Sequence, residues 1–142
     1  MRSWFLRKRG LLWVVGIFAL GIMGGLVWAQ GVGDVEPGPN QVILYEHANW
    51  GGNSMSFNLD QSVADLRSWR FTNSSTNWND KISSIKVGAN VKVKVYKDIN
   101  YKGGDITLMG TGSGGTGSFP NLTTIGWNDK ISSLKVQIGN IN

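Results

Sequence analysis

The stretch Trp78-Asn79-Asp80-Lys81-Ile82-Ser83-Ser84-Ile85-Lys86-Val87 recurs as Trp127-Asn128-Asp129-Lys130-Ile131-Ser132-Ser133-Leu134-Lys135-Val136. Ten positions with one conservative difference, repeated after 49 residues, indicate a duplicated unit. Each copy places one Asn, one Asp and two Ser within six residues. These side chains offer the hard oxygen donors that Ca²⁺ prefers, and none of the thiolate or imidazole groups that softer metals prefer. Calcium is therefore the leading ligand hypothesis.

Residues 1–29 have the composition of an export signal. Four basic residues precede an uncharged apolar run from Leu11 to Val27, and Ala29 supplies the small residue required before a signal-peptidase cut. We predict cleavage after Ala29 and a secreted, extracellular protein. The alternative is an uncleaved membrane anchor formed by residues 10–29, because roughly 17 to 25 apolar residues can span a bilayer.

The charge of the chain gives little support to polyanionic partners. The formal net charge is +5, but from Gln30 onward ten basic and nine acidic residues leave only +1. We therefore expect no nucleic-acid partner, and a membrane partner only if the N-terminal segment is retained. The lysines at 92, 94 and 97 are the only local excess, and an alternating strand places such residues on its solvated face.

Composition also limits the architecture. The sequence has no cysteine, so a core, a bound metal or both must hold the exported domain together. Removal of residues 1–29 leaves 113 of the 142 residues, which suffices for one compact domain, and we expect a monomer. Residues 30–40 contain three glycines and two prolines without apolar periodicity, and this predicts a flexible leader.

The remaining chain, residues 41–138, has strand signals every 8 to 12 residues and no convincing long helix, which favours an antiparallel sandwich. Motif one, residues 41–88, is expected to contain a hairpin of 41–46 and 54–59, a helical turn or loop over 62–69, a polar loop over 73–77 and a closing strand over 82–87. Motif two, residues 91–138, is expected to contain a strand with Val91, Val93 and Val95 inward and Lys92 and Lys94 outward, a turn over 96–104, a return strand over 105–108, a glycine-rich loop over 110–118 and a closing strand over 131–138.

Each motif begins with a second shared pattern: an aromatic residue, another aromatic five positions later and a glycine two beyond that. The residues are Tyr45, Trp50 and Gly52, then Tyr96, Tyr101 and Gly103. Followed by the Asn-Asp-x-x-Ser-Ser stretch, this order resembles the microbial calcium-binding βγ-crystallin domains over roughly residues 41–136. The resemblance implies an all-β, βγ-crystallin-like antiparallel Greek key β-sandwich, one domain of two duplicated motifs. The glycine is expected to have a positive φ.

The resemblance also implies a set of metal ligands for two Ca²⁺ ions. In the family, the second, third and fifth positions of the Asn-Asp stretch bind through a side chain, a carbonyl and a hydroxyl. Another carbonyl comes from the residue three places after the hairpin's first aromatic. In this chain the implied ligands are Asp80, Lys81, Ser83 and Ala48 from motif one, and Asp129, Lys130, Ser132 and Ile99 from motif two. Both lysine ammonium groups must then point away from the ions.

We expect the two sites to be built crosswise. If the chain is extended, Asp80 and Ser83 lie about 10 Å apart on opposite sides, whereas two oxygens on one Ca²⁺ lie within about 5 Å of each other. The ligands would then group as Ala48, Ser83, Asp129 and Lys130 at one site, and as Ile99, Ser132, Asp80 and Lys81 at the other.

Two binding functions other than calcium binding remain open. An enzyme is not expected, because His47 is the only histidine and the sequence contains neither cysteine nor a GxSxG motif. A secreted peptidase inhibitor or toxin-like effector of the same fold is one alternative binding protein. A carbohydrate-binding module is the other, if Trp50, Trp69, Trp78 and Trp127 form a platform; Trp78 and Trp127 are more readily explained by packing. The Asn-Asp stretches could also be simple turns.

Overall fold

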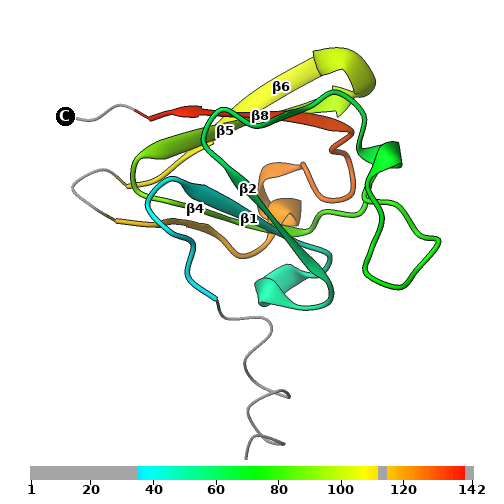
Figure 1. The fold of residues 1–142 in the computed structure, drawn as a ribbon, viewed down its shortest axis with the longest axis horizontal. Helices are drawn as coiled ribbons and strands as arrows, with labels where there is room; N and C mark the ends of the chain where they lie inside the picture. Colours follow the sequence, from blue (N-terminus) through cyan, green and yellow to red (C-terminus); the bar gives the residue numbers. More distant parts are fainter. Residues whose placement is uncertain (1–34, 112–114, 140–142) are drawn as a thin grey trace, which may run out of the picture. The chain divides into compact units, whose positions relative to one another are not determined.

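The computed structural model describes residues 35–111 and 115–139. The described strands form two four-stranded antiparallel sheets, a first sheet in the order β2-β1-β4-β7 and a second sheet in the order β3-β8-β5-β6 (Figure 1). The strands are β1 Gln41–Tyr45, β2 Ser54–Asn58, β3 Ser62–Val63, β4 Ser84–Val87, β5 Val91–Asp98, β6 Lys102–Met109, β7 Gly117–Phe119 and β8 Ser133–Ile138.

The helical segments of the described residues are single 3₁₀ turns: η1 Ala48–Trp50, η2 Leu66–Ser68, η3 Ile99–Tyr101 and η4 Leu122–Ile125. Across residues 35–111 and 115–139, no helix has the length and apolar character needed to cross a bilayer. The segment predicted to be a signal or anchor, residues 1–29, lies outside the described residues, and its role stays a prediction.

The two motifs exchange strands between the sheets. β3 of motif one pairs with β8 in the second sheet, and β7 of motif two pairs with β4 in the first sheet. Both sheets are antiparallel throughout the described pairs, as the sequence predicted. The all-β Greek key sandwich is confirmed.

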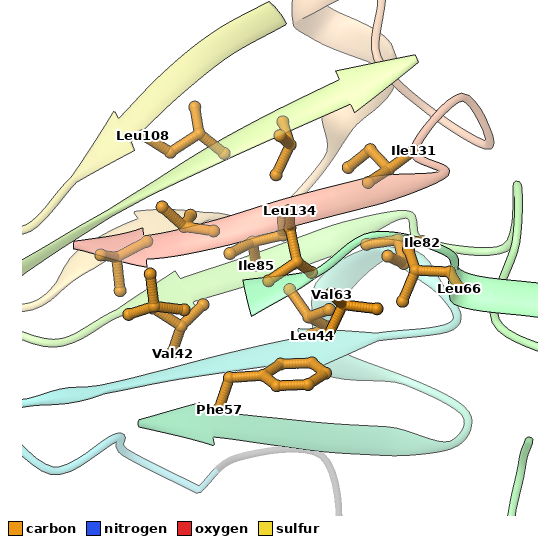
Figure 2. Close-up of a cluster of buried hydrophobic side chains, with 14 of the residues drawn as sticks. Val42, Leu44, Phe57, Val63, Leu66, Ile82, Ile85, Leu108, Ile131 and Leu134 are labelled. Carbon is orange, nitrogen blue, oxygen red and sulfur yellow. The ribbon is translucent and has the colours of Figure 1, made fainter. Parts of the chain in front are cut away.

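The core lies between the two sheets. Val91, Val93 and Val95 are buried, whereas Lys92 and Lys94 alternate with them and remain partly exposed, as expected for a half-buried strand. Figure 2 shows side chains such as Leu44 and Ile85 of the first sheet meeting side chains of the second sheet in one layer.

The two tryptophans that open the repeated stretches are also buried in the core. Trp78 is 1% exposed and Trp127 is 7% exposed, so both pack the domain and neither can form part of an exposed sugar-binding platform. Trp69 is 39% exposed and stands edge-on to Phe57.

Two short strands were not predicted. The expected glycine-rich loop over 110–118 ends where β7 begins, at Gly117, and the segment 62–69 contains β3 before the turn η2. These strands have three and two residues, too few to show the period-two alternation that identifies a strand.

Gly117 allows two backbone segments to approach closely. A Cβ at Gly117 would lie 2.1 Å from the Met109 carbonyl oxygen, so a side chain there would block this approach.

Part of the predicted leader contacts the outer face of the first sheet. Pro37 is buried, the Tyr45 hydroxyl donates to the Val35 carbonyl at 3.1 Å, and the Lys86 ammonium pairs with Glu36 at 2.5 Å. Lys86 is only 2% exposed. Residues 35–39 therefore cover a lysine that would otherwise face solvent; the flexibility of the leader as a whole stays a prediction.

We expect removal of this covering segment to destabilise the domain. A chain that begins at Gln41 loses the ion pair made by Glu36 and the hydrogen bond accepted by Val35. A hydrogen bond to a charged group contributes about 1.5–3 kcal/mol and a neutral one about 0.5–1.5 kcal/mol. Urea denaturation of this chain and of one that begins at Gly33 should show a lower midpoint for the shorter chain. Equal midpoints would show that residues 35–39 contribute nothing to stability.

Candidate metal centre

Each Asn-Asp pair forms a tight turn that bonds to the other motif. Asp80 and Asp129 have positive φ values of 54° and 52°, in the left-handed region that Asp tolerates better than most residues. The Asp80 amide donates to the Ile131 carbonyl at 3.0 Å, and the Asp129 amide donates to the Ile82 carbonyl at 3.1 Å. The two turns are thus connected to each other by reciprocal backbone hydrogen bonds.

Neighbouring asparagines orient the two carboxylates. The Asn79 side-chain amide donates to Asp80 Oδ2 at 2.7 Å, and Asn128 donates to Asp129 Oδ2 at the same distance. One oxygen of each carboxylate is therefore held by its own turn, which leaves Oδ1 directed to other partners.

The other carboxylate oxygens meet serines from the opposite motif. Ser83 Oγ lies 3.4 Å from Asp129 Oδ1, and Ser132 Oγ lies 3.3 Å from Asp80 Oδ1. Both serines are nearly buried, whereas both aspartates are exposed at the surface. The structure thus places together the Ser and Asp of each predicted crossed set.

The chain from Asp80 to Ser83 is not extended throughout, as the predicted crossing required, because Asp80 is in a left-handed turn. The hydrogen bonds between the two turns, which no spacing rule reveals, account for the cross-motif contacts.

The hairpin turns lie beside the same serines. The Ser83 amide donates to the Tyr45 carbonyl at 3.0 Å, and the Ser132 amide donates to the Tyr96 carbonyl at 2.9 Å. Three residues further on, Ala48 begins η1 and Ile99 begins η3. Gly52 and Gly103, at the ends of these turns, have φ values of 73° and 79°, as the resemblance predicted.

The second serine of each copy positions a hairpin turn, a role that was not predicted. Ser84 and Ser133 are fully buried. Ser84 Oγ donates to the His47 carbonyl at 2.6 Å and accepts from the Trp50 amide at 3.3 Å. Ser133 does the same with the Asp98 carbonyl at 2.6 Å and the Tyr101 amide at 3.0 Å.

Each of these hydroxyls fixes the two residues that flank a turn carbonyl predicted to bind metal. Their presence in both copies of the repeat was the signal that could have revealed this role.

The lysines of the predicted ligand sets have exposed side chains with interactions of their own. Lys130 Nζ donates to the Gly126 carbonyl at 2.9 Å. The positive charge of Lys81 helps to lower the pKa of Glu46. Burial raises the pKa of Glu46, but hydrogen bonds from Asn53 and the charges of His47 and Lys81 outweigh burial, so the pKa of Glu46 is below its usual value. The Lys130 ammonium is thus held by a backbone carbonyl.

The donors at each crossed pair are one carboxylate, one hydroxyl and nearby carbonyls. In residues 35–111 and 115–139, no three His, Cys, Asp or Glu side chains gather as a metal cluster. A hard cation with oxygen ligands and low ligand charge fits these donors, whereas zinc or copper would require imidazole or thiolate. Asn79 Oδ1, next to Asp80, is a buried acceptor without a hydrogen-bond donor.

A two-sheet Greek key sandwich with paired Asn-Asp turns defines a βγ-crystallin type of domain. The family model for Beta/Gamma crystallin matches residues 38–135, and the chain belongs to this family.

The chain is similar to Spherulin-3A from Physarum polycephalum, with 36% identity over 72 residues, 51% of this chain and 62% of that protein. The chain thus matches less than two thirds of that relative's length. The solved structure of spherulin 3A has 32% identity and a TM-score of 0.54, and the match covers 77% of this chain and 93% of that one.

Two further solved structures share the fold. A βγ-crystallin domain from Clostridium beijerinckii has 28% identity and a TM-score of 0.51, covering 68% of this chain and 95% of that one. A βγ-crystallin domain of the Abundant Perithecial Protein from Neurospora crassa, solved in its Ca²⁺-bound form, has 23% identity and a TM-score of 0.57, covering 77% of this chain and all of that one.

Replacement of Ser84 by alanine should destabilise the domain by about 1–3 kcal/mol, because the partly buried His47 carbonyl and Trp50 amide lose their shared hydrogen-bond partner, the buried Ser84 hydroxyl. Ser56→Ala, at an exposed position of β2, is the matched control and should change stability by less than about 0.5 kcal/mol. Thermal or chemical denaturation measures both variants. Equal stability of the two would contradict the role assigned to Ser84.

Proposed function

We propose that this chain is an exported, non-enzymatic calcium-binding module of the βγ-crystallin type, stabilised by two Ca²⁺ ions. The observation that carries the proposal is the pairing of Ser83 with Asp129 and of Ser132 with Asp80 across the two motifs. Each pair is long for a hydrogen bond between two oxygens, and an ion could bind between the hydroxyl and carboxylate oxygens. The Ca²⁺-bound form of the Neurospora relative gives the proposal further support.

One site would use Asp129, Ser83 and the carbonyls of Ala48 and Lys130, and the other would use Asp80, Ser132 and the carbonyls of Ile99 and Lys81. The hydroxyls of Ser84 and Ser133 would hold each hairpin turn so that its carbonyl faces the ion. When bound, Ca²⁺ supplies positive charge that attracts oxygen ligands from both motifs. Binding would therefore oppose separation of the two motifs.

The non-enzymatic part of the proposal rests on the residues available for chemistry. The single histidine, His47, is exposed on the hairpin turn. Export rests on the sequence pattern of residues 1–29. No observation in the described residues favours the inhibitor or carbohydrate alternatives over calcium.

We expect two weak calcium sites. Each contains only one carboxylate, and low ligand charge places the dissociation constant on the order of 10⁻⁵–10⁻³ M. Isothermal titration calorimetry of the mature domain should show binding of two ions, with Mg²⁺ as a competing hard cation for comparison. Absence of heat at millimolar Ca²⁺ would remove the proposal.

Calcium should raise the melting temperature without being needed for folding, because the core is already continuous between the sheets. At a hundredfold excess over the dissociation constant, one site adds about 2.7 kcal/mol if the unfolded chain does not bind. Circular dichroism of the calcium-free protein should show β structure; its absence would mean that the metal is required to fold the chain.

Paired mutants test the crossed arrangement. Asp80→Ala with Ser132→Ala removes donors from one proposed site, so one ion should still bind with unchanged affinity. Asp80→Ala with Ser83→Ala removes a donor from each site, so both affinities should fall. The two double mutants carry the same substitution types and serve as each other's control. The reverse result, with both ions weakened in the first mutant and one in the second, would exclude crossed sites.

A further inference from the structure

The outer face of the second sheet carries three neighbouring lysines. Lys92 and Lys94 project from β5 on the side opposite its buried valines, and Lys94 lies directly opposite Lys135 of β8. Like charges at directly opposed positions of an antiparallel pair are destabilising. This face therefore carries an electrostatic cost that an anionic group would relieve.

Within the domain, only part of this charge is neutralised. Lys94 pairs with Asp105 at 3.2 Å, and its ammonium lies 5.6 Å from the centre of the Tyr96 ring. Lys135 lies 4.2 Å from the centre of the Tyr101 ring, and no carboxylate of the described residues forms an ion pair with it. Lys135 is half-buried on an aromatic ring and has no acidic partner among the residues that the structure describes.

The same set of residues on the first sheet binds a carboxylate. Lys86 occupies the position of Lys135 in the repeat, and its ammonium lies 4.9 Å from the centre of the Trp50 ring. There Glu36 pairs with Lys86, and Tyr45, the counterpart of Tyr96, donates to the Val35 carbonyl. A lysine on an aromatic ring beside a buried tyrosine thus receives an extended acidic segment of this chain.

Two differences between the faces describe what the second sheet would bind. Ile43 lies opposite Lys86, whereas Lys94 lies opposite Lys135, so the second face offers two ammonium groups in place of one.

The other difference is at the end of the closing strand. A Cβ at Gly88 would lie 2.2 Å from the Gly38 carbonyl oxygen, and the repeat places Gln137 at that position in the second motif. A bound segment could not follow the whole path of residues 35–39 there. It would contact the end of the face formed by Lys94, Tyr96, Tyr101 and Lys135.

We propose that this end of the second sheet is a docking site for an extended acidic peptide segment of a partner protein. One carboxylate of that segment pairs with Lys135, as Glu36 pairs with Lys86, and a second lies near Lys94. Neither lysine belongs to the proposed calcium sites.

The probe is a synthetic peptide with the sequence of residues 34–40, Asp-Val-Glu-Pro-Gly-Pro-Asn, compared with the same peptide in which Asn and Gln replace the two acidic residues. Both are titrated into the isotope-labelled mature chain, and amide chemical shifts are followed. The acidic peptide should shift signals of β5 and β8 around Lys94 and Lys135 with a millimolar dissociation constant, and added salt should weaken the binding.

Lys135→Gln should weaken this binding at least fivefold, whereas Arg67→Gln, which removes one positive charge from the exposed turn η2, should leave it unchanged. An unchanged spectrum of the free variants shows that both remain folded. Equal responses to the acidic and neutral peptides, shifts confined to β1 and β4 around Lys86, or no shift at 10 mM peptide would each overturn the proposal. Binding of anionic vesicles through the same lysines, without peptide binding, would also overturn it.

Discussion

The reciprocal hydrogen bonds between the two Asn-Asp turns are the constraint on which the site depends. The Asp80 amide donates to the Ile131 carbonyl, and the Asp129 amide donates to the Ile82 carbonyl. Each turn is therefore positioned by the other motif. The serines and carboxylates then meet across the motifs. The hairpins are positioned in turn, because the amides of Ser83 and Ser132 donate to carbonyls of the hairpin strands. Loss of these backbone hydrogen bonds would therefore affect both candidate sites, whereas loss of one side chain removes a donor from one site only.

Much of the fold could be predicted from the sequence, because it depends on local patterns. Alternation in Val91 to Val95 marked a half-buried strand, and the aromatic and glycine spacing marked the hairpins. The strands β3 and β7 were missed because they have two and three residues, and their pairing comes from distant partners. Local patterns carry no information of that kind.

The candidate site shows the same division. The residue types that could bind calcium were evident from the repeat, whereas the roles of Ser84, Ser133 and the neighbouring asparagines required the three-dimensional structure. The burial of Lys86 was equally hidden, since residues 35–39 cover it and its partner Glu36 lies fifty positions away in the sequence. A proline- and glycine-rich segment gives no periodic signal that it will pack against a sheet.

The exchange of β3 and β7 between the sheets bears on whether one motif could be stable by itself. A single motif would leave one sheet without its outer strand, with unpaired backbone groups and half of a core exposed to water. Because one chain carries both motifs, the association between them is intramolecular and does not depend on the concentration of the protein. The two halves are not equivalent, since a lysine covered in one half is partly exposed in the other.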